Sequence, residues 1–220
     1  MGDNNNVWEK TYQNTKQLWG SNPDSKLMQY FDLIKRGNLL DLGIGEGRNA
    51  LPFTFEGFNI DGVDITETAL NRCKENLNKK NLVINLVNSD LREYDIKKDT
   101  YTLIIVANVL NFFRKSEIKI IIEKIKEGLK EDGVVYLNIF STLEPRYKLM
   151  KTSEKQVEKN TFYIEEKESY IHYFTQEEIN SYFSEFELFC CSEGLEYYYS
   201  HGNPHYHGGI EFMARKKRFL

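Results

Sequence analysis

Residues 38–49 read NLLDLGIGEGRN, a short apolar run followed by three glycines at every second position. The run has the length of a buried strand, and a helical pattern continues from the last glycine to Glu56. Glycines at a strand-to-helix turn let the chain turn tightly and let a ligand approach the backbone. The N–H groups of such a turn and the N-terminus of the helix face the same ligand. The stretch therefore predicts a ligand-binding loop at the edge of a sheet.

The chain on either side of this loop alternates between strands and helices. Further strands are predicted at 58–63, 83–87, 101–107, 133–140, 186–191 and 210–214, and helices at 26–35, 66–79, 116–130 and 175–183. Such alternation gives a parallel sheet with right-handed crossovers. We therefore predict an α/β, doubly wound, Rossmann-like fold with seven strands and helices on both faces of the sheet.

Composition limits the partners and the compartment of this chain of 220 residues. Its net charge of −4 disfavours a nucleic-acid binder. The longest apolar stretch, 103–110, is interrupted by Asn108 and is too short to span a bilayer, and the polar first residues contain no apolar signal core. Three cysteines cannot all pair, so reduced thiols and a cytoplasmic location are expected. Nothing in the composition predicts an oligomeric state.

Three acids end successive predicted strands, at Asp41, Asp64 and Asp90. Open α/β sheets bind ligands at this carboxyl edge. The glycine spacing is G-x-G-x-G, not the dinucleotide fingerprint G-x-G-x-x-G, and an acid beside the loop would repel a pyrophosphate. Adenosine attached to a sulfonium amino acid offers an ammonium group to Asp41, a diol to Asp64 and an exocyclic amine to Asp90. We therefore predict S-adenosylmethionine as the cofactor, with a helix cap or turn as the alternative role for Asp90.

Residues 41–49, Asp64, 89–91 and 101–108 resemble the successive motifs of class I S-adenosylmethionine-dependent methyltransferases. The resemblance covers residues 36–140, and the Gly-Arg-Asn end of the loop resembles the tellurite-resistance (TehB-like) branch. It implies a seven-stranded sheet whose last strand is antiparallel. The cofactor-binding residues predicted on these motifs are Asp41, Gly43, Gly45, Gly47, Arg48, Asn49, Asp64, Ile65, Asp90, Leu91, Ala107 and Asn108. A helix cap is an equal alternative for Asn108.

The resemblance also divides the chain, which we expect to form one domain over 1–220. In many related enzymes an N-terminal helix lies over the cofactor, so we predict a helical lid at 1–35, with Tyr12 and Trp19 as further cofactor contacts. Simple packing is the alternative role for these two rings. The cofactor-binding core is predicted at 36–140, an insertion that caps the substrate at 141–173, and a C-terminal helix with a β-hairpin at 174–220.

Three of the four histidines lie close together, at His201, His205 and His207. They precede the last predicted strand, on the cofactor side of the sheet. Histidines in this place bind an anionic substrate, act as a base, ligate a metal or merely occupy a polar loop. We take all three as catalytic candidates and assign no metal site. The resemblance implies that His201 faces the substrate.

Together these features predict an S-adenosylmethionine-dependent methyltransferase that acts on a small molecule. We favour a chalcogen oxyanion or a thiol as the acceptor, followed by an amine or an oxygen acid. No Asn/Asp-Pro-Pro-aromatic turn follows residue 107, which argues against enzymes that methylate amino groups of nucleobases. Methyl transfer has no obligatory catalytic residue, so a non-catalytic regulatory protein that binds the cofactor stays open as an alternative. A nicotinamide-dependent oxidoreductase is disfavoured by the loop spacing.

Overall fold

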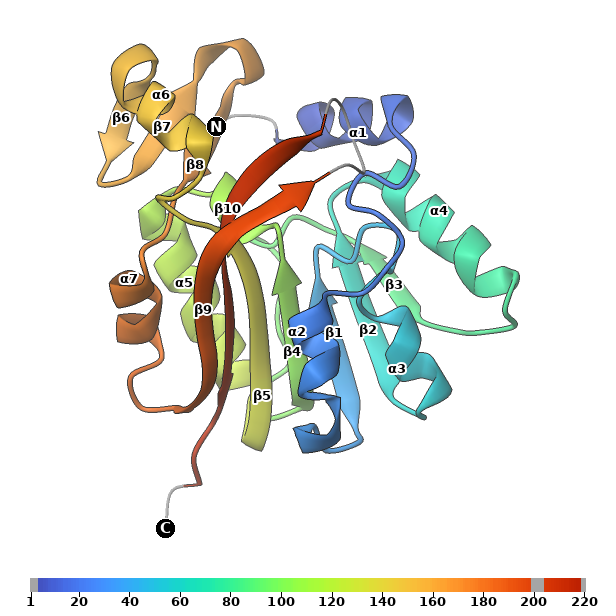
Figure 1. The fold of residues 1–220 in the computed structure, drawn as a ribbon. Coiled ribbons are helices and arrows are strands. Elements are labelled where there is room, and N and C mark those ends of the chain that lie inside the picture. The colour runs from blue at the N-terminus through green and yellow to red at the C-terminus, as the bar shows by residue number, and fades with distance from the viewer. Residues whose placement is uncertain (1–3, 199–203, 219–220) are drawn as a thin grey trace.

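The computed structural model describes residues 4–198 and 204–218 and is shown in Figure 1. A sheet of seven strands forms its centre, in the order β3-β2-β1-β4-β5-β10-β9. The strands are β1 (Asn38–Leu42), β2 (Asn59–Asp64), β3 (Asn85–Asn88), β4 (Tyr101–Ala107), β5 (Leu129–Phe140), β9 (Glu187–Tyr198) and β10 (His205–Arg215). Neighbours among the first five pair in parallel, and β10 pairs antiparallel with both β5 and β9. This confirms the predicted fold class, including the antiparallel last strand.

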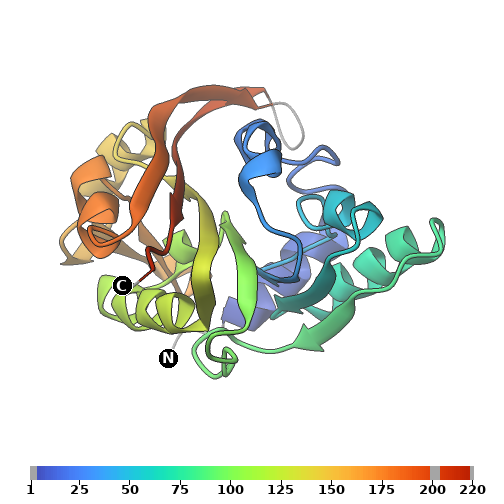
Figure 2. The same ribbon diagram turned by 90° about the horizontal axis from the view of Figure 1, so that it is seen from below.

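Helices pack on both faces of the sheet, as Figure 2 shows from below. One face is covered by α5 (Lys115–Gly128) and α7 (Gln176–Tyr182), and the other by α2 (Ser25–Gln29), α3 (Leu51–Phe55) and α4 (Glu67–Asn78). The central strand β4 supplies both cores: Ile104 packs on the α5 face and Leu103 on the α3 face. A strand that is buried on both faces has a continuous apolar run, which is why the sequence located β4 so clearly.

The N-terminal segment is less helical than predicted. A helix, α1 (Asn4–Asn14), lies across the top of the sheet in Figure 1 and contacts α4. The helix predicted at 26–35 ends at Gln29 in α2 and is followed by a 3₁₀ turn, η1 (Phe31–Leu33). The ring of Phe31 packs 5.0 Å from that of Phe53, so tertiary packing competes with a continuous helix here.

Residues 145–172 form a small subdomain with an apolar cluster of its own. Within the predicted insertion, β7 (Thr161–Ile164) and β8 (Ser169–His172) form a hairpin joined by η3 (Glu165–Lys167). A third strand, β6 (Lys155–Glu158), and a helix, α6 (Pro145–Ser153), complete the subdomain and were not predicted. Their polar sequences carry weak patterns, and burial of Tyr147 and Met150 against β7 and β8 holds α6 in place.

The hairpin of β9 and β10 is much longer than the predicted strands at 186–191 and 210–214. β10 pairs with β5 from Gly209 onward, while residues 205–208 pair with β9 alone beyond the end of β5. The hairpin therefore extends past the carboxyl edge of the sheet, at the same end of the molecule as α1 (Figure 1). None of the helices described is long and apolar enough to cross a membrane.

Candidate cofactor and acceptor site

The glycine loop after β1 has a backbone that only glycine adopts without strain. Gly43, Gly45 and Gly47 have φ angles of 78°, 55° and 89°, in the left-handed region. A Cβ on Gly43 would also lie 2.1 Å from the side chain of Val109. The N–H groups of residues 43 and 44 bind the carbonyl oxygen of Val63 at 2.7 and 2.9 Å. The loop is thus fixed against the end of β2.

Asp64, at the end of β2, fastens the loop from the other side. Its carboxylate accepts hydrogen bonds from the N–H of Gly45 at 2.9 Å and from the N–H and hydroxyl of Thr66 at 2.9 and 2.7 Å. Burial raises the pKa of Asp64, although these hydrogen bonds oppose the rise. A carboxylate has about four lone-pair positions, so acceptor capacity is left for a ligand. Asp64 therefore serves the loop as well as the cavity that it lines.

Asp41 is buried beneath the loop, where it lines a cavity together with Arg48. Burial raises the pKa of Asp41 to about 8, and the nearby Arg48 guanidinium opposes that rise only in part. The pKa of an aspartate in the unfolded chain is about 3.9, so between about pH 4 and pH 8 the folded chain binds one proton more than the unfolded chain. Its contribution to stability is complete below about pH 4 and is lost as the pH rises towards 8.

An ammonium group placed beside Asp41 would favour the charged carboxylate and so expel this proton. We expect binding of S-adenosylmethionine at pH 6.5 to release close to one proton, and the affinity to rise with pH. Calorimetry in two buffers of different ionisation enthalpy measures the release. The Asp41→Asn variant should release none, and equal heats for the wild type in both buffers would contradict this role of Asp41.

The Arg-Asn pair that ends the loop organises Asp24, which lies just before α2. Arg48 donates to one Asp24 carboxylate oxygen at 2.5 Å, and the amide groups of Asn49 and Asn138 donate to the other at 3.2 Å. The backbone N–H of Asp24 in turn donates a hydrogen bond to Asn49 Oδ1 at 2.8 Å. Asp24 and Asn138 were not predicted as site residues, because they lie 24 and 90 residues from Arg48 and no local pattern links them to it.

Asp90, after β3, is bound by Arg92, a neighbour that was not predicted to contact it. The Arg92 guanidinium binds both carboxylate oxygens, and the Arg92 N–H binds one of them at 2.9 Å. Burial alone would raise the pKa of Asp90, but these bonds lower it below its usual value. Asp90 still lines the cavity, so an adenine amine would share this carboxylate with Arg92.

The predicted cofactor residues meet at two adjoining cavities. The α1 cavity lies between α1 and the strand ends and is lined by Trp8, Tyr12, Trp19, Gly43, Asp64, Ile65, Ser89, Asp90, Leu91, Ala107, Asn108, Val109, Phe112 and Phe113. The loop cavity follows the glycine loop and is lined by Tyr12, Leu18, Trp19, Gly20, Asp41, Gly43, Ile44, Gly45, Glu46, Arg48, Asn49 and Ala107. Every predicted cofactor residue except Gly47 lines one of them. Gly47 has a conformational role in the loop, since its φ is left-handed.

A third cavity opens beneath the long hairpin. This hairpin cavity is lined by Trp19, Asp24, Asn108, Asn138, Phe140, Ser192, Gly194, Glu196, His207, Gly209 and Glu211. It shares Trp19 and Asn108 with the α1 cavity. Asn108 has a left-handed φ of 58°, and the 3₁₀ turn that follows, η2 (Leu110–Phe112), has Val109 at its N-cap. Asn108 is thus placed between two cavities and is not that helix cap.

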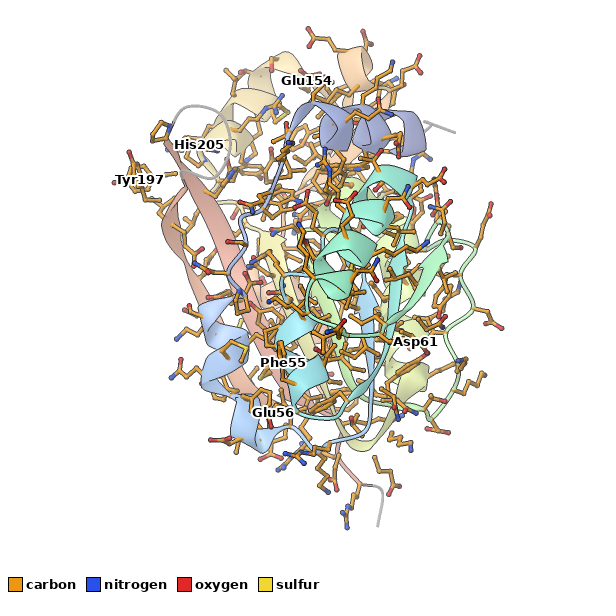
Figure 3. All side chains as sticks on the ribbon, turned by 90° about the vertical axis from the view of Figure 1, so that its right-hand side faces the viewer. Phe55, Glu56, Asp61, Glu154, Tyr197 and His205 are labelled. Atoms are coloured by element: carbon orange, nitrogen blue, oxygen red, sulfur yellow. The ribbon has the colours of Figure 1, made fainter. Side chains whose placement is uncertain are left out.

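Two of the three candidate histidines lie on β10, with their Nε2 atoms 2.8 Å apart. The Nδ1 atom of His207 lies 3.1 Å from a Glu144 carboxylate oxygen, which also accepts from the N–H of Gly208 at 2.9 Å. The His207 ring stacks on Phe140 at 5.3 Å. Figure 3 shows His205 at the tip of the hairpin. His201 lies outside the residues that the structure describes.

No group of three or more metal-ligating side chains is present within 4–198 and 204–218. The fourth histidine, His172, is buried in the interior, where its Nδ1 lies 2.8 Å from the Thr161 hydroxyl oxygen and its Nε2 lies 3.3 Å from a Glu178 carboxylate oxygen. His172 therefore belongs to the packing of the subdomain against α7.

Comparisons with known proteins support the assignment of the domain. Residues 39–133 match the model of a family described as a methyltransferase domain. Over 125 residues the chain is 29% identical to a putative methyltransferase of Geobacillus sp. (strain WCH70), a match that covers 56% of this chain and 50% of that protein. Over 101 residues it is 30% identical to the probable S-adenosyl-L-methionine-dependent methyltransferase TehB of Haemophilus influenzae, covering 46% of this chain and 35% of TehB.

The crystal structure of TehB from Haemophilus influenzae has the same fold. It superimposes with a TM-score of 0.69 at 21% sequence identity, covering 88% of this chain and 62% of that one. The sequence matches to the methyltransferase family and to TehB confirm the predicted resemblance to S-adenosylmethionine-dependent methyltransferases of the TehB-like branch, and the crystal structure of TehB confirms the fold. The matched stretch spans half or less of the length of the two curated relatives.

Proposed function

We propose that this chain, which carries a class I S-adenosylmethionine-dependent methyltransferase domain of the TehB-like branch, transfers the methyl group to a small molecule bound in the hairpin cavity. One observation carries the proposal: the hairpin cavity shares Trp19 and Asn108 with the α1 cavity, which is lined by the residues predicted to bind adenosine. An acceptor in the one would lie beside the methyl donor in the other.

The residues present fit the cofactor. The loop cavity offers Arg48 to a carboxylate and Asp41 to an ammonium group, and the α1 cavity offers Asp64 to a ribose diol. When bound, the cofactor supplies the methyl group and the leaving sulfide. The chain supplies orientation and a site that excludes water. Trp8 and Phe112, whose rings lie 4.5 Å apart, form an apolar wall that fits this second task.

The hairpin cavity also indicates what the candidate histidines do. His207 lines it, and Glu144 holds the His207 ring in one orientation by binding Nδ1. We propose that the His207 ring contacts the acceptor through the side that lines the cavity, while its Nε2 atom lies 2.8 Å from that of His205. His201 stays a prediction.

The acidic side chains of the hairpin cavity affect which of the predicted acceptors, a chalcogen oxyanion or a thiol, could bind there. Glu196 and Glu211 line it, and two carboxylates oppose the binding of a chalcogen oxyanion. A thiol or an amine meets no such repulsion. The non-catalytic alternative gives no reason for a polar cavity beside the methyl donor. A small-molecule N- or O-methyltransferase remains the second candidate, because these same carboxylates favour it.

A methyl-transfer screen tests the proposal. The protein is incubated with S-adenosylmethionine and a panel of thiols, selenite, tellurite and small amines, and the release of S-adenosylhomocysteine is measured. We expect release with at least one class of acceptor. If S-adenosylmethionine binds tightly but no class of acceptor gives S-adenosylhomocysteine, the non-catalytic regulatory protein is favoured. If S-adenosylmethionine does not bind, the cofactor assignment is refuted.

A further inference from the structure

The floor of the hairpin cavity is made of backbone where two glycines lie side by side. Gly194 of β9 pairs with Gly209 of β10, which pairs on its other side with Phe140 of β5. A Cβ on Gly194 would meet no atom within 4 Å, and a Cβ on Gly209 would make only ordinary contacts, the nearest at 3.4 Å. Neither glycine has a left-handed φ. The backbone does not require glycine here, so the missing side chains leave space for a ligand.

Acidic side chains stand on both sides of this floor. Alternate residues of a strand project from the same face of a sheet, so His207, Gly209 and Glu211 share one face of β10. Glu196 pairs with His207, and Glu211 pairs with Asn138 of β5. The Tyr136 hydroxyl donates to Glu211 Oε1 at 2.8 Å, which fixes the Glu211 carboxylate over the cavity.

Neither carboxylate has a salt-bridge partner within residues 4–198 and 204–218. Asp24 is paired with Arg48, but neither Glu196 nor Glu211 forms an ion pair with any residue that the structure describes. Burial raises the pKa of Glu211 to about 7; the Tyr136 hydrogen bond opposes that rise, Glu196 and Asp24 add to it, and Lys26 opposes it. The hairpin cavity is thus lined by two carboxylates without an ion-pair partner in the described part of the chain, and Lys26 is close enough to affect Glu211 but forms no salt bridge with it.

Aromatic rings complete the walls. Trp19 and Phe140 line the cavity with their centroids 6.4 Å apart, and Phe140 also stacks on His207. The faces of aromatic rings attract cations, and Trp attracts them most strongly. Carboxylates and aromatic rings around a bare floor therefore favour a small positively charged group over a neutral or negative one.

We propose that the hairpin cavity binds a small amine as the methyl acceptor, held by Glu211 and Glu196 over the Gly194–Gly209 floor. The inference rests on the proposed function and names its substrate class. The ammonium form of the amine passes one proton to the Glu211 carboxylate. The freed nitrogen lone pair then forms the N–C bond as the C–S bond breaks, and that electron pair goes to sulfur. The products are S-adenosylhomocysteine, an N-methylammonium group and a protonated Glu211.

The test compares matched probes on the full chain with S-adenosylmethionine labelled in the methyl group. Tyramine, 2-phenylethylamine and histamine are assayed beside 2-phenylethanethiol, 3-phenylpropionate and selenite. A labelled N-methylammonium product, separated from unreacted S-adenosylmethionine and formed only from amines, is the expected result. Label in a thioether, an ester or a methylated selenium compound would overturn the amine assignment but keep the methyltransferase, while bound cofactor with no labelled product would overturn both.

Two variants distinguish a proton-accepting role of Glu211 from a merely structural one. Glu211→Gln is expected to lower kcat/KM for the amine about 10- to 100-fold, the usual effect of losing a hydrogen bond to a charged group. We expect kcat/KM of the wild type to rise with pH near 7, as Glu211 loses its proton, and this rise should be absent from Glu211→Gln. Glu193→Gln makes the same charge change on the opposite face of β9 and should match the wild type. An unchanged pH profile in Glu211→Gln would refute the proton transfer.

Filling the floor gives an independent check. Gly194→Val is expected to lower kcat/KM for the amine at least about tenfold, because the added methyl groups occupy the hairpin cavity. The affinity for S-adenosylhomocysteine should stay within twofold of the wild type, which shows that the variant is folded. Full activity of Gly194→Val would place the acceptor elsewhere.

Discussion

Replacing Asp64 with alanine is expected to weaken the binding of S-adenosylmethionine about 100-fold or more. The variant loses the carboxylate proposed to accept from the ribose diol, and two hydrogen bonds to a charged acceptor are worth about 3 kcal/mol or more. It also loses the bond from the Gly45 N–H and both bonds from Thr66, so the glycine loop is released from the end of β2. Calorimetric titration with the cofactor measures the effect.

Asp61 provides the matched control on the same strand. Its carboxylate accepts from Asn85 and Tyr101 and lines none of the three cavities. Asp61→Asn should therefore bind the cofactor as the wild type does. A thermal melt without cofactor separates the two roles of Asp64, since release of the loop lowers the melting temperature whether or not a ligand is present. Unchanged cofactor affinity in Asp64→Ala would show that the cofactor does not use this carboxylate.

Replacing His207 with alanine is expected to lower kcat about 100-fold while the cofactor affinity stays near the wild-type value. The ring forms one wall of the hairpin cavity and is proposed to contact the acceptor, and an acceptor displaced by about 1 Å reacts about 10²-fold more slowly. Glu144→Gln should have a smaller effect, about tenfold, because glutamine still binds the ring but no longer with a charge. His205→Ala is expected to lower turnover as well, since its ring lies 2.8 Å from that of His207.

Tyr206 lies between the two histidines on β10 and points to the opposite face, where it packs against Tyr197. Tyr206→Ala is therefore the control, and it should keep the wild-type turnover. Turnover is measured by the release of S-adenosylhomocysteine with the acceptor that the screen identifies. If His205→Ala and His207→Ala both keep full turnover, the histidines have a structural role in the hairpin.

Local sequence was enough to predict the sheet and the cofactor edge. Residues 38–49 specify a strand, a turn that needs left-handed glycines and the start of a helix, all within one short segment. The apolar run of β4 and the amphipathic pattern of α5 are equally local. Because the carboxyl ends of parallel strands share one edge, Asp41, Asp64 and Asp90 had to meet there once the strands were placed.

The partners of these acids could not be predicted in the same way. Asp90 had been expected to offer its carboxylate to adenine, yet Arg92 already binds both oxygens. Asp64 had been predicted to bind only the ribose, and it also accepts a hydrogen bond from the glycine loop. Competition between side chains for one acceptor depends on distances and rotamers, which no spacing rule contains.

The proposed acceptor site could be recognised only from the tertiary structure. The hairpin cavity joins Trp19 and Asp24 of the N-terminal segment, Asn138 of β5, and Gly194 and Glu211 of the hairpin. These residues are far apart in the sequence, and nothing in their local patterns distinguishes a polar strand face beside a cavity from one that faces water. The sequence determined the fold and the cofactor motifs because both follow from local periodicity and turn chemistry. The methyl acceptor is decided by contacts between distant segments, which exist only once the chain has folded.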